Sequence, residues 1–204
     1  MMALAFDEDT HTYRVDGRPV PGVTEICSHL TPCGFDASNA VLAQAVRRGT
    51  RVHELTELVD YGALPDEIEP ELVGYLRAYL SFLRDYRPVW LHIEHRMADG
   101  ANGFAGTADR IGLISGALTV VDLKTNSGFT RGEKIRLAVQ LEGYARLFAS
   151  CCETPVVRRL GLRLLRDGKY TVYDADKIAR KYDFFPADLF DSLLEITKLM
   201  GGYR

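Results

Sequence analysis

Two short segments place acidic and basic side chains where they could act together on a metal ion. Gly106-Thr-Ala-Asp109 precedes Asp122-Leu-Lys124, and Asp109 is thirteen positions before Asp122. Successive side chains of a β-strand point to opposite faces, so Asp122 and Lys124 would share one face. A turn at Ser115-Gly116 would bring Asp109 beside them. Carboxylates are ligands that Mg²⁺ prefers, so the spacing predicts a metal site. An exposed strand face with a salt bridge is the alternative.

The net charge of −3 is distributed unevenly along the chain. Residues 131–181 hold twelve basic and six acidic residues, whereas residues 54–71 hold seven acids and no lysine or arginine. Such blocks are usually solvated faces, but they would also set a cationic groove beside carboxylates, which suits a polyanionic substrate. We expect some basic residues of the last predicted hairpin to contact phosphates, from the set Arg158, Arg159, Arg163, Arg166 and Lys169.

Length and composition are those of an ordinary globular protein. The chain has 204 residues, of which 47% are hydrophobic and 26% charged, and this length allows a core without disulfides or metals. No stretch has the roughly 18 apolar residues of a membrane span, and the start lacks a secretory signal. Cys27, Cys33, Cys151 and Cys152 form no Cys-x-x-Cys pair. We therefore expect reduced thiols in a cytoplasmic protein, with no iron–sulfur cluster.

Hydrophobic periodicity predicts the elements that must position these side chains. Apolar residues recur at helical spacing in four segments, residues 37–59, 70–86, 131–149 and 186–200. Alternation and turn residues predict strands and hairpins, over residues 11–26, 89–98, 104–114, 117–125 and 156–174. We find no repeat or linker. The order predicts one α/β domain spanning residues 1–204, with a mixed, mainly antiparallel central sheet flanked by helices. The hairpin within residues 1–26 would be appended to this core.

Four motifs follow one another between residues 13 and 144. They are Tyr13 to Val23 with its Pro-Gly-Val, Gly49-x-x-x-His53, Asp109 with Asp122-Leu-Lys124, and Gln140-x-x-x-Tyr144. Together they resemble motifs of the PD-(D/E)xK nucleases. The resemblance is closest to the RecB-like branch, which includes phage and prophage exonucleases, and it implies a restriction-endonuclease-like core.

The resemblance also implies a role for each matched residue. Mg²⁺ or Mn²⁺ would be held by three side chains and one main-chain carbonyl, those of His53, Asp109, Asp122 and Leu123. Lys124 would orient or deprotonate the attacking water. Glu94 matches an acid often seen on the preceding strand and is either an auxiliary metal residue or a plain strand-edge acid. His92 and His95 flank it at a spacing that predicts opposite faces.

A helix face would complete the site. Arg136, Gln140 and Tyr144 are each one turn apart, so they share one face that would order a phosphate or the catalytic lysine. Ordinary amphipathicity is the alternative. We further expect DNA contacts from four arginines, Arg48, Arg51, Arg131 and Arg136.

These observations favour a Mg²⁺- or Mn²⁺-dependent deoxyribonuclease, more specifically an exonuclease acting on DNA ends. The phage-like start indicates recombination or repair, where a recombination or annealing protein would be a partner. Two alternatives stay open: a DNA-end-binding or partner module with weak catalysis, and a restriction-type endonuclease. Related exonucleases include rings of subunits, so an oligomer is compatible with the resemblance. Polarity and strand preference are not encoded in these motifs.

Overall fold

The computed structural model describes residues 3–8, 10–30 and 39–203, without the side chains of residues 39–42. Cys33 and the first two residues of the helix expected over 37–59 lie outside the described residues. The three described cysteines are free thiols. None of the described helices combines the length and the apolar character needed to cross a bilayer.

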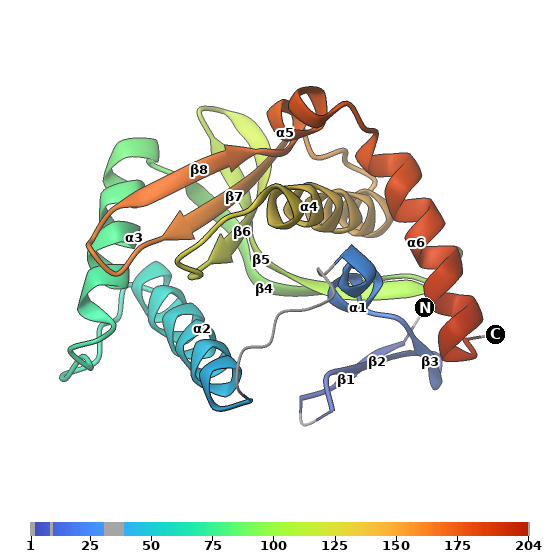
Figure 1. Ribbon diagram of the computed structural model, residues 1–204, viewed down its shortest axis with the longest axis horizontal. Coiled ribbons are helices and arrows are strands. Elements are labelled where there is room, and N and C mark those ends of the chain that lie inside the picture. The colour runs from blue at the N-terminus through green and yellow to red at the C-terminus, as the bar shows by residue number, and fades with distance from the viewer. Residues whose placement is uncertain (1–2, 9, 31–38, 204) are drawn as a thin grey trace.

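A five-stranded mixed sheet forms the centre of the molecule (Figure 1). Its strands lie in chain order, as β4 (Val89–Asp99), β5 (Phe104–Ile114), β6 (Ala117–Lys124), β7 (Arg158–Leu164) and β8 (Tyr170–Asp174). Only the pairing of β6 with β7 is parallel. Helix α4 (Arg131–Cys152) makes the crossover that this parallel pair requires. The mixed, mainly antiparallel sheet flanked by helices is therefore confirmed.

The turn between β5 and β6 sets the register at the predicted metal site. Ser115 and Gly116 both have positive φ, 52° and 77°, as a two-residue type I′ hairpin requires. The hairpin pairs Arg110 with Val121, so the next residues on each strand, Asp109 and Asp122, come side by side.

Helices cover both faces of the sheet and bury two apolar clusters. On one face α4 packs with three other helices, α1 (Val23–Ile26), α5 (Ala175–Tyr182) and α6 (Pro186–Gly201). On the other face lie α2 (Asn39–Asp60) and α3 (Val73–Tyr86). Val120 packs in the first cluster and Val121 in the second, because alternate residues of β6 face opposite sides.

A small sheet at the N-terminus adds a wall to the core. It comprises β1 (Leu4–Asp7), β2 (Thr12–Val15) and β3 (Arg18–Val20), all antiparallel. The expected hairpin with its turn at Asp16-Gly17 is confirmed as β2–β3, but it ends at Val20 and gains a third strand, β1. A single-turn 3₁₀ segment, η1 (Cys27–Leu30), follows α1. The amide of Ala105 donates to the Pro21 carbonyl, which ties this sheet to β5.

Two helices differ from the expectation. Helix α3 begins at Val73, three residues after Pro70, because a turn closed by the Leu72 amide and the Glu69 carbonyl precedes it. Helix α5 was not predicted. It is eight residues long, and the side chain of Asp174 caps it by accepting from the amides of Asp176 and Lys177. Such a short helix gives little periodicity in the sequence.

Candidate functional site

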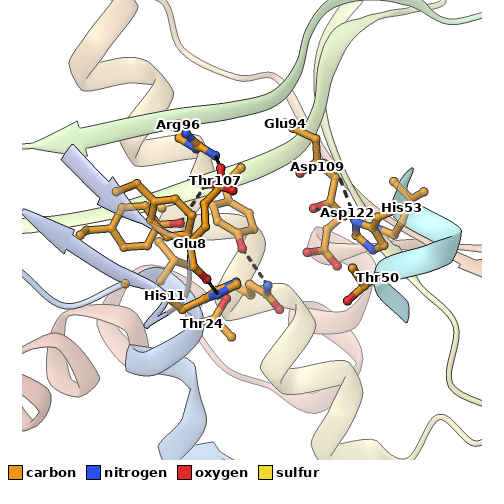
Figure 2. A pocket seen from close by; sticks show the side chains of 18 of the residues that line it. Glu8, His11, Thr24, Thr50, His53, Glu94, Arg96, Thr107, Asp109 and Asp122 are labelled. Atoms are coloured by element: carbon orange, nitrogen blue, oxygen red, sulfur yellow. Dashed lines mark hydrogen bonds and ion pairs between the residues drawn. The ribbon is translucent and has the colours of Figure 1, made fainter. Parts of the chain in front are cut away.

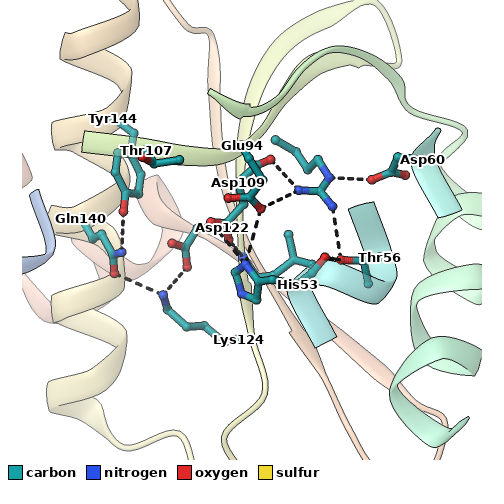
Figure 3. Close-up of polar contacts among 12 residues, drawn as sticks. His53, Thr56, Asp60, Glu94, Thr107, Asp109, Asp122, Lys124, Gln140 and Tyr144 are labelled. Atoms are coloured by element: carbon teal, nitrogen blue, oxygen red, sulfur yellow. Dashed lines mark hydrogen bonds and ion pairs between the residues drawn. The ribbon is translucent and has the colours of Figure 1, made fainter. Parts of the chain in front are cut away.

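Three potential metal ligands from three different elements meet beside the middle of β4 and β5. His53 of α2, Glu94 of β4 and Asp109 of β5 each offer a ligand atom, and these atoms lie within 4.8 Å of one another (Figure 3). His53 Nδ1 is 3.6 Å from Glu94 Oε1 and 3.7 Å from Asp109 Oδ1. Neighbouring ligands of one ion with bonds near 2 Å lie about 3–4 Å apart, so the cluster suits one divalent cation.

A kink in β4 aims Glu94 at this cluster. Glu94 has a φ of +47°, in the left-handed region, which interrupts the alternation of side chains along the strand. The expectation that His92 and His95 face opposite ways is therefore wrong. Their ring centroids are 4.2 Å apart, and both rings pack against Phe148 of α4.

Asp122 is the fourth candidate ligand and lies beside Asp109 (Figure 3). It is 1% exposed, and its Oδ2 lies 2.5 Å from Lys124 Nζ without accepting a hydrogen bond of normal geometry. Burial raises the pKa of Asp122, and Lys124 opposes this rise. A buried carboxylate oxygen that accepts no hydrogen bond can still coordinate a divalent cation.

Asp109 is fixed by the neighbouring strand. Its Oδ2 accepts a 2.6 Å hydrogen bond from the amide of Leu123, which leaves Oδ1 facing His53. The main chain of Leu123 thus lies against the cluster. Its carbonyl as a metal ligand stays a prediction.

A hydrogen-bonded chain runs from the lysine into α4. Lys124 Nζ donates to Gln140 Oε1 over 3.3 Å, and Gln140 Nε2 donates to the hydroxyl of Tyr144 over 2.9 Å. Burial raises the pKa of Tyr144 well above its usual value, so the phenol stays neutral. Because Tyr144 takes the amide nitrogen, the amide oxygen of Gln140 must face Lys124. Two residues of the expected helix face, Gln140 and Tyr144, thus join Lys124 in one chain of hydrogen bonds, whereas a role of this face in ordering a phosphate stays a prediction.

One buried arginine, which the sequence reasoning missed, supports the cluster from behind. The side chain of Arg110 is fully buried, and its Nε donates to Asp60 Oδ2 over 2.5 Å. Its other nitrogens donate to Glu94, to the Asp109 carbonyl and to Thr56. The only sequence signal was its place directly after Asp109 in an apolar strand.

The four arginines expected to contact DNA lie in different surroundings. Arg48 and Arg136 line cavities of about 430 and 420 Å³, and the buried Nε of each lacks a hydrogen-bond partner among the described residues. Arg51 pairs with Glu54 and Glu69 on the surface. The guanidinium of Arg131 lies 5.1 Å from the ring centroid of Tyr182. DNA contact by any of them stays a prediction.

A cavity of about 840 Å³ opens over the candidate metal ligands His53, Glu94 and Asp109. The N-terminal sheet lines one side of it and α2 lines the other, with Asp109 and Asp122 between them (Figure 2). The candidate site is therefore shared by the small sheet and the central sheet.

No protein-family model matches the chain, and no curated protein sequence does. Among solved structures, an alkaline exonuclease (LHK-Exo) from Laribacter hongkongensis aligns with a TM-score of 0.37 and 12% identity over 90% of this chain and 94% of that chain. The same exonuclease in complex with dAMP aligns with a TM-score of 0.35 and 13% identity, over 90% of this chain and 93% of that chain. The structure of SSO0001 aligns with a TM-score of 0.32 and 18% identity, over 84% of this chain and 75% of that chain. At these TM-scores the functional proposal rests on the chain's own residues.

The charge state of His53 gives a first prediction. Burial lowers its pKa, but the carboxylates of Asp109 and Glu94 outweigh burial and raise it to about 9. In metal-free protein, NMR should titrate His53 near pH 9, and Glu94→Gln should bring the midpoint towards 6.5. Folding favours the protonated imidazole, so its stabilisation is complete below pH 6.5 and is lost as pH rises through about 9. A wild-type midpoint at or below 6.5 would contradict this.

The buried Arg110–Asp60 pair gives a second prediction. Arg110→Met leaves Asp60 charged in the interior, which should cost about 3–5 kcal/mol of unfolding free energy. Adding Asp60→Leu removes the stranded charge and should recover part of the loss. Urea unfolding of both variants measures this. The exposed Arg84–Asp85 pair is the control, because Arg84→Met should change stability little. Equal losses of unfolding free energy in Arg110→Met and Arg84→Met would contradict a stabilising role for the buried pair.

Proposed function

We propose that this protein is a Mg²⁺- or Mn²⁺-dependent deoxyribonuclease that removes nucleotides from DNA ends. The observation that carries the proposal is the convergence of His53, Glu94, Asp109 and Asp122 beside the amine of Lys124. Acidic ligands with an adjacent lysine suit hydrolysis of a phosphodiester, in which negative charge develops next to a metal ion. The motif resemblance to PD-(D/E)xK nucleases supports the same reaction.

The ion would be held by His53, Asp109, Asp122 and the Leu123 carbonyl, with Glu94 as a further ligand. When bound, it would lower the pKa of a coordinated water and offset charge on the phosphate. Glu94 is held by Arg110 and Asp109 by the Leu123 amide, so two ligands are oriented before an ion arrives.

Lys124 would act on the reacting groups directly. Its amine lies between Asp122 and Gln140, at the edge of the cavity. From there it would orient or deprotonate the attacking water and offset charge on the phosphorane-like transition state. Gln140 and Tyr144 position the lysine rather than touch the substrate.

DNA would be bound through its backbone. Arg48 and Arg136 are the best placed of the expected arginines, because each lines a cavity and has a buried Nε without a partner among the described residues. Arg51 is instead paired with acids, and Arg131 lies against the ring of Tyr182. Contacts of this kind are independent of base sequence. The resemblance extends the proposal to a cytoplasmic role in phage or prophage recombination or repair, beside an annealing protein.

Digestion of labelled DNA tests the function. Linear single- and double-stranded DNA should be degraded with Mg²⁺ or Mn²⁺, and EDTA should stop the reaction. Covalently closed circular DNA should resist, because an exonuclease needs an end. Cleavage of the circle at the rate of linear DNA would contradict the exonuclease. Intact linear DNA in both metals would contradict the nuclease.

A third prediction separates the acids from the lysine. Asp122→Asn removes a charged ligand, so affinity for Mn²⁺ should fall, whereas Lys124→Ala removes a cation beside the ion and should leave affinity equal or higher. Both variants should lose about 10²–10⁴-fold in cleavage rate. Titration calorimetry with Mn²⁺ distinguishes them. If Lys124→Ala loses metal as badly as Asp122→Asn, the lysine is structural.

A fourth prediction concerns the backbone contacts. Arg136→Gln should weaken binding of all DNA sequences alike in Ca²⁺ and should reduce the slope of log affinity against log salt by about one. Arg180→Gln is the matched control, because Arg180 is exposed on α5 and lines none of the three cavities. Fluorescence anisotropy over a salt series measures both variants. Equal slopes in wild type and Arg136→Gln would show that Arg136 does not contact the DNA backbone.

A further inference from the structure

Three neighbouring cavities at the candidate site differ in the charge of the side chains that line them. The 840 Å³ cavity shares Lys124 and Gln140 with the 420 Å³ cavity, which shares Thr125 with the 430 Å³ cavity. The 420 Å³ cavity is lined by Arg136 and Lys124 against one acid, Glu133, and the 430 Å³ cavity by Arg48, Arg163 and Arg166 against one acid, Asp167, so basic side chains outnumber acids in both. The large one is lined by acids besides the candidate ligands, namely Glu8, Glu25, Glu54 and Glu57. A polyanionic strand would therefore be favoured at one end and repelled at the other.

The acidic end also carries a group of aromatic rings. Phe6 packs against Tyr13 with ring centroids 4.6 Å apart and against His11 at 5.3 Å. Tyr13 is buried, Phe6 is half-buried and His11 is exposed, so the group reaches from the core into the cavity. The Tyr13 hydroxyl bonds Thr107 Oγ1 over 2.8 Å. Because Thr107 is two residues before Asp109 on β5, this hydrogen bond ties the aromatic group to the strand that carries one of the candidate ligands.

Arg96 is the one arginine among the described residues that line the large cavity, and it is paired with an acid. Arg96 Nη2 donates to Glu8 Oε1 over 2.6 Å, and its guanidinium lies 4.7 Å from the ring centroid of Phe6. Glu57, on the opposite wall, has no ion pair or hydrogen bond from its side chain among the described residues. This end therefore offers the exposed ring of His11 beside the half-buried ring of Phe6, which already contacts Tyr13 and Arg96, together with net negative charge. Aromatic rings suit a nucleobase, and the negative charge disfavours a phosphate.

We propose that the aromatic end receives a single terminal nucleoside whose chain end is a hydroxyl, while the rest of the strand follows the arginine-lined cavities. The inference rests on the proposed function and deepens it. The base would stack on Phe6 and His11, and the first phosphodiester would then lie at the metal cluster. A second nucleotide beyond the cluster would bring its phosphate among the acids. The enzyme would thus cleave one nucleotide from an end and would work less well on an end that carries a phosphate.

The test measures the first cleavage of oligonucleotides that differ only at the digested end. Three ends are compared: a normal nucleoside with a hydroxyl, the same end phosphorylated, and an abasic residue with a hydroxyl. Each change is made separately at the 5′ and at the 3′ end, so that the test covers digestion from either end. The terminal phosphate should lower kcat/KM about 10-fold. The abasic end should raise KM about 5- to 150-fold, the range of base–aromatic stacking.

Variants assign these effects to residues. Phe6→Leu keeps an apolar side chain but removes the ring, so it should raise KM for normal ends and abolish the difference between normal and abasic ends. Glu57→Gln should weaken discrimination against the terminal phosphate. Glu67→Gln, the same change at an exposed position outside the cavities, is the control and should not. Thermal unfolding checks that each variant is folded.

Three outcomes would overturn the inference while leaving the nuclease intact. They are a terminal phosphate that speeds or does not change the first cleavage, a wild type that treats abasic and normal ends alike, and a folded Phe6→Leu that still distinguishes them. A protein that cleaves no DNA with either metal would instead refute the proposed function itself.

Discussion

The buried ion pair of Arg110 and Asp60 holds the two halves of the candidate site together. A fully buried guanidinium is tolerated only when its donors are satisfied, and Arg110 meets acceptors on α2, β4 and β5. Asp60 in turn accepts from Tyr79 of α3 and Trp90 of β4. Since Asp60 ends the helix that carries His53, the pair fixes where His53 lies relative to Asp109.

Arg110 and Lys124 address the same electrostatic difficulty from opposite sides. Glu94, Asp109 and Asp122 concentrate three carboxylates in little space, which is costly without compensating cations. Arg110 bonds Glu94 from the interior, and Lys124 pairs with Asp122 at the cavity. Asp60, which also pairs with Arg110, adds a fourth carboxylate. Two cations against four acids leave net negative charge beside His53, which a divalent ion would offset. The guanidinium of Arg110 is fully buried, whereas the amine of Lys124 lines the cavity.

Local patterns predicted the central sheet well because alternation and turn chemistry act within a few residues. The shared face of Asp122 and Lys124 follows from strand geometry alone, and the approach of Asp109 follows from the Ser115-Gly116 turn. The contacts that depend on distant segments were not predictable in this way. In the sequence Arg110 is a charged residue within an apolar strand, and its partner Asp60 is fifty residues earlier, so the ion pair has no local signal. The left-handed backbone of Glu94, which reversed the expectation for His92 and His95, likewise has no local signature.

The first and last of the four motifs pack against the strand that carries Asp109. Gly106, three residues before Asp109, has no side chain, and a Cβ there would lie 3.0–3.1 Å from Val23, Tyr144 and Leu147. Val23 belongs to the first motif and Tyr144 to the last, so both reach β5 at a position where nothing larger than glycine fits easily. Tyr144 is also the residue that orients Gln140 towards Lys124. Packing at Gly106 therefore sets the position of the lysine as well as the distance of the N-terminal sheet from the metal cluster.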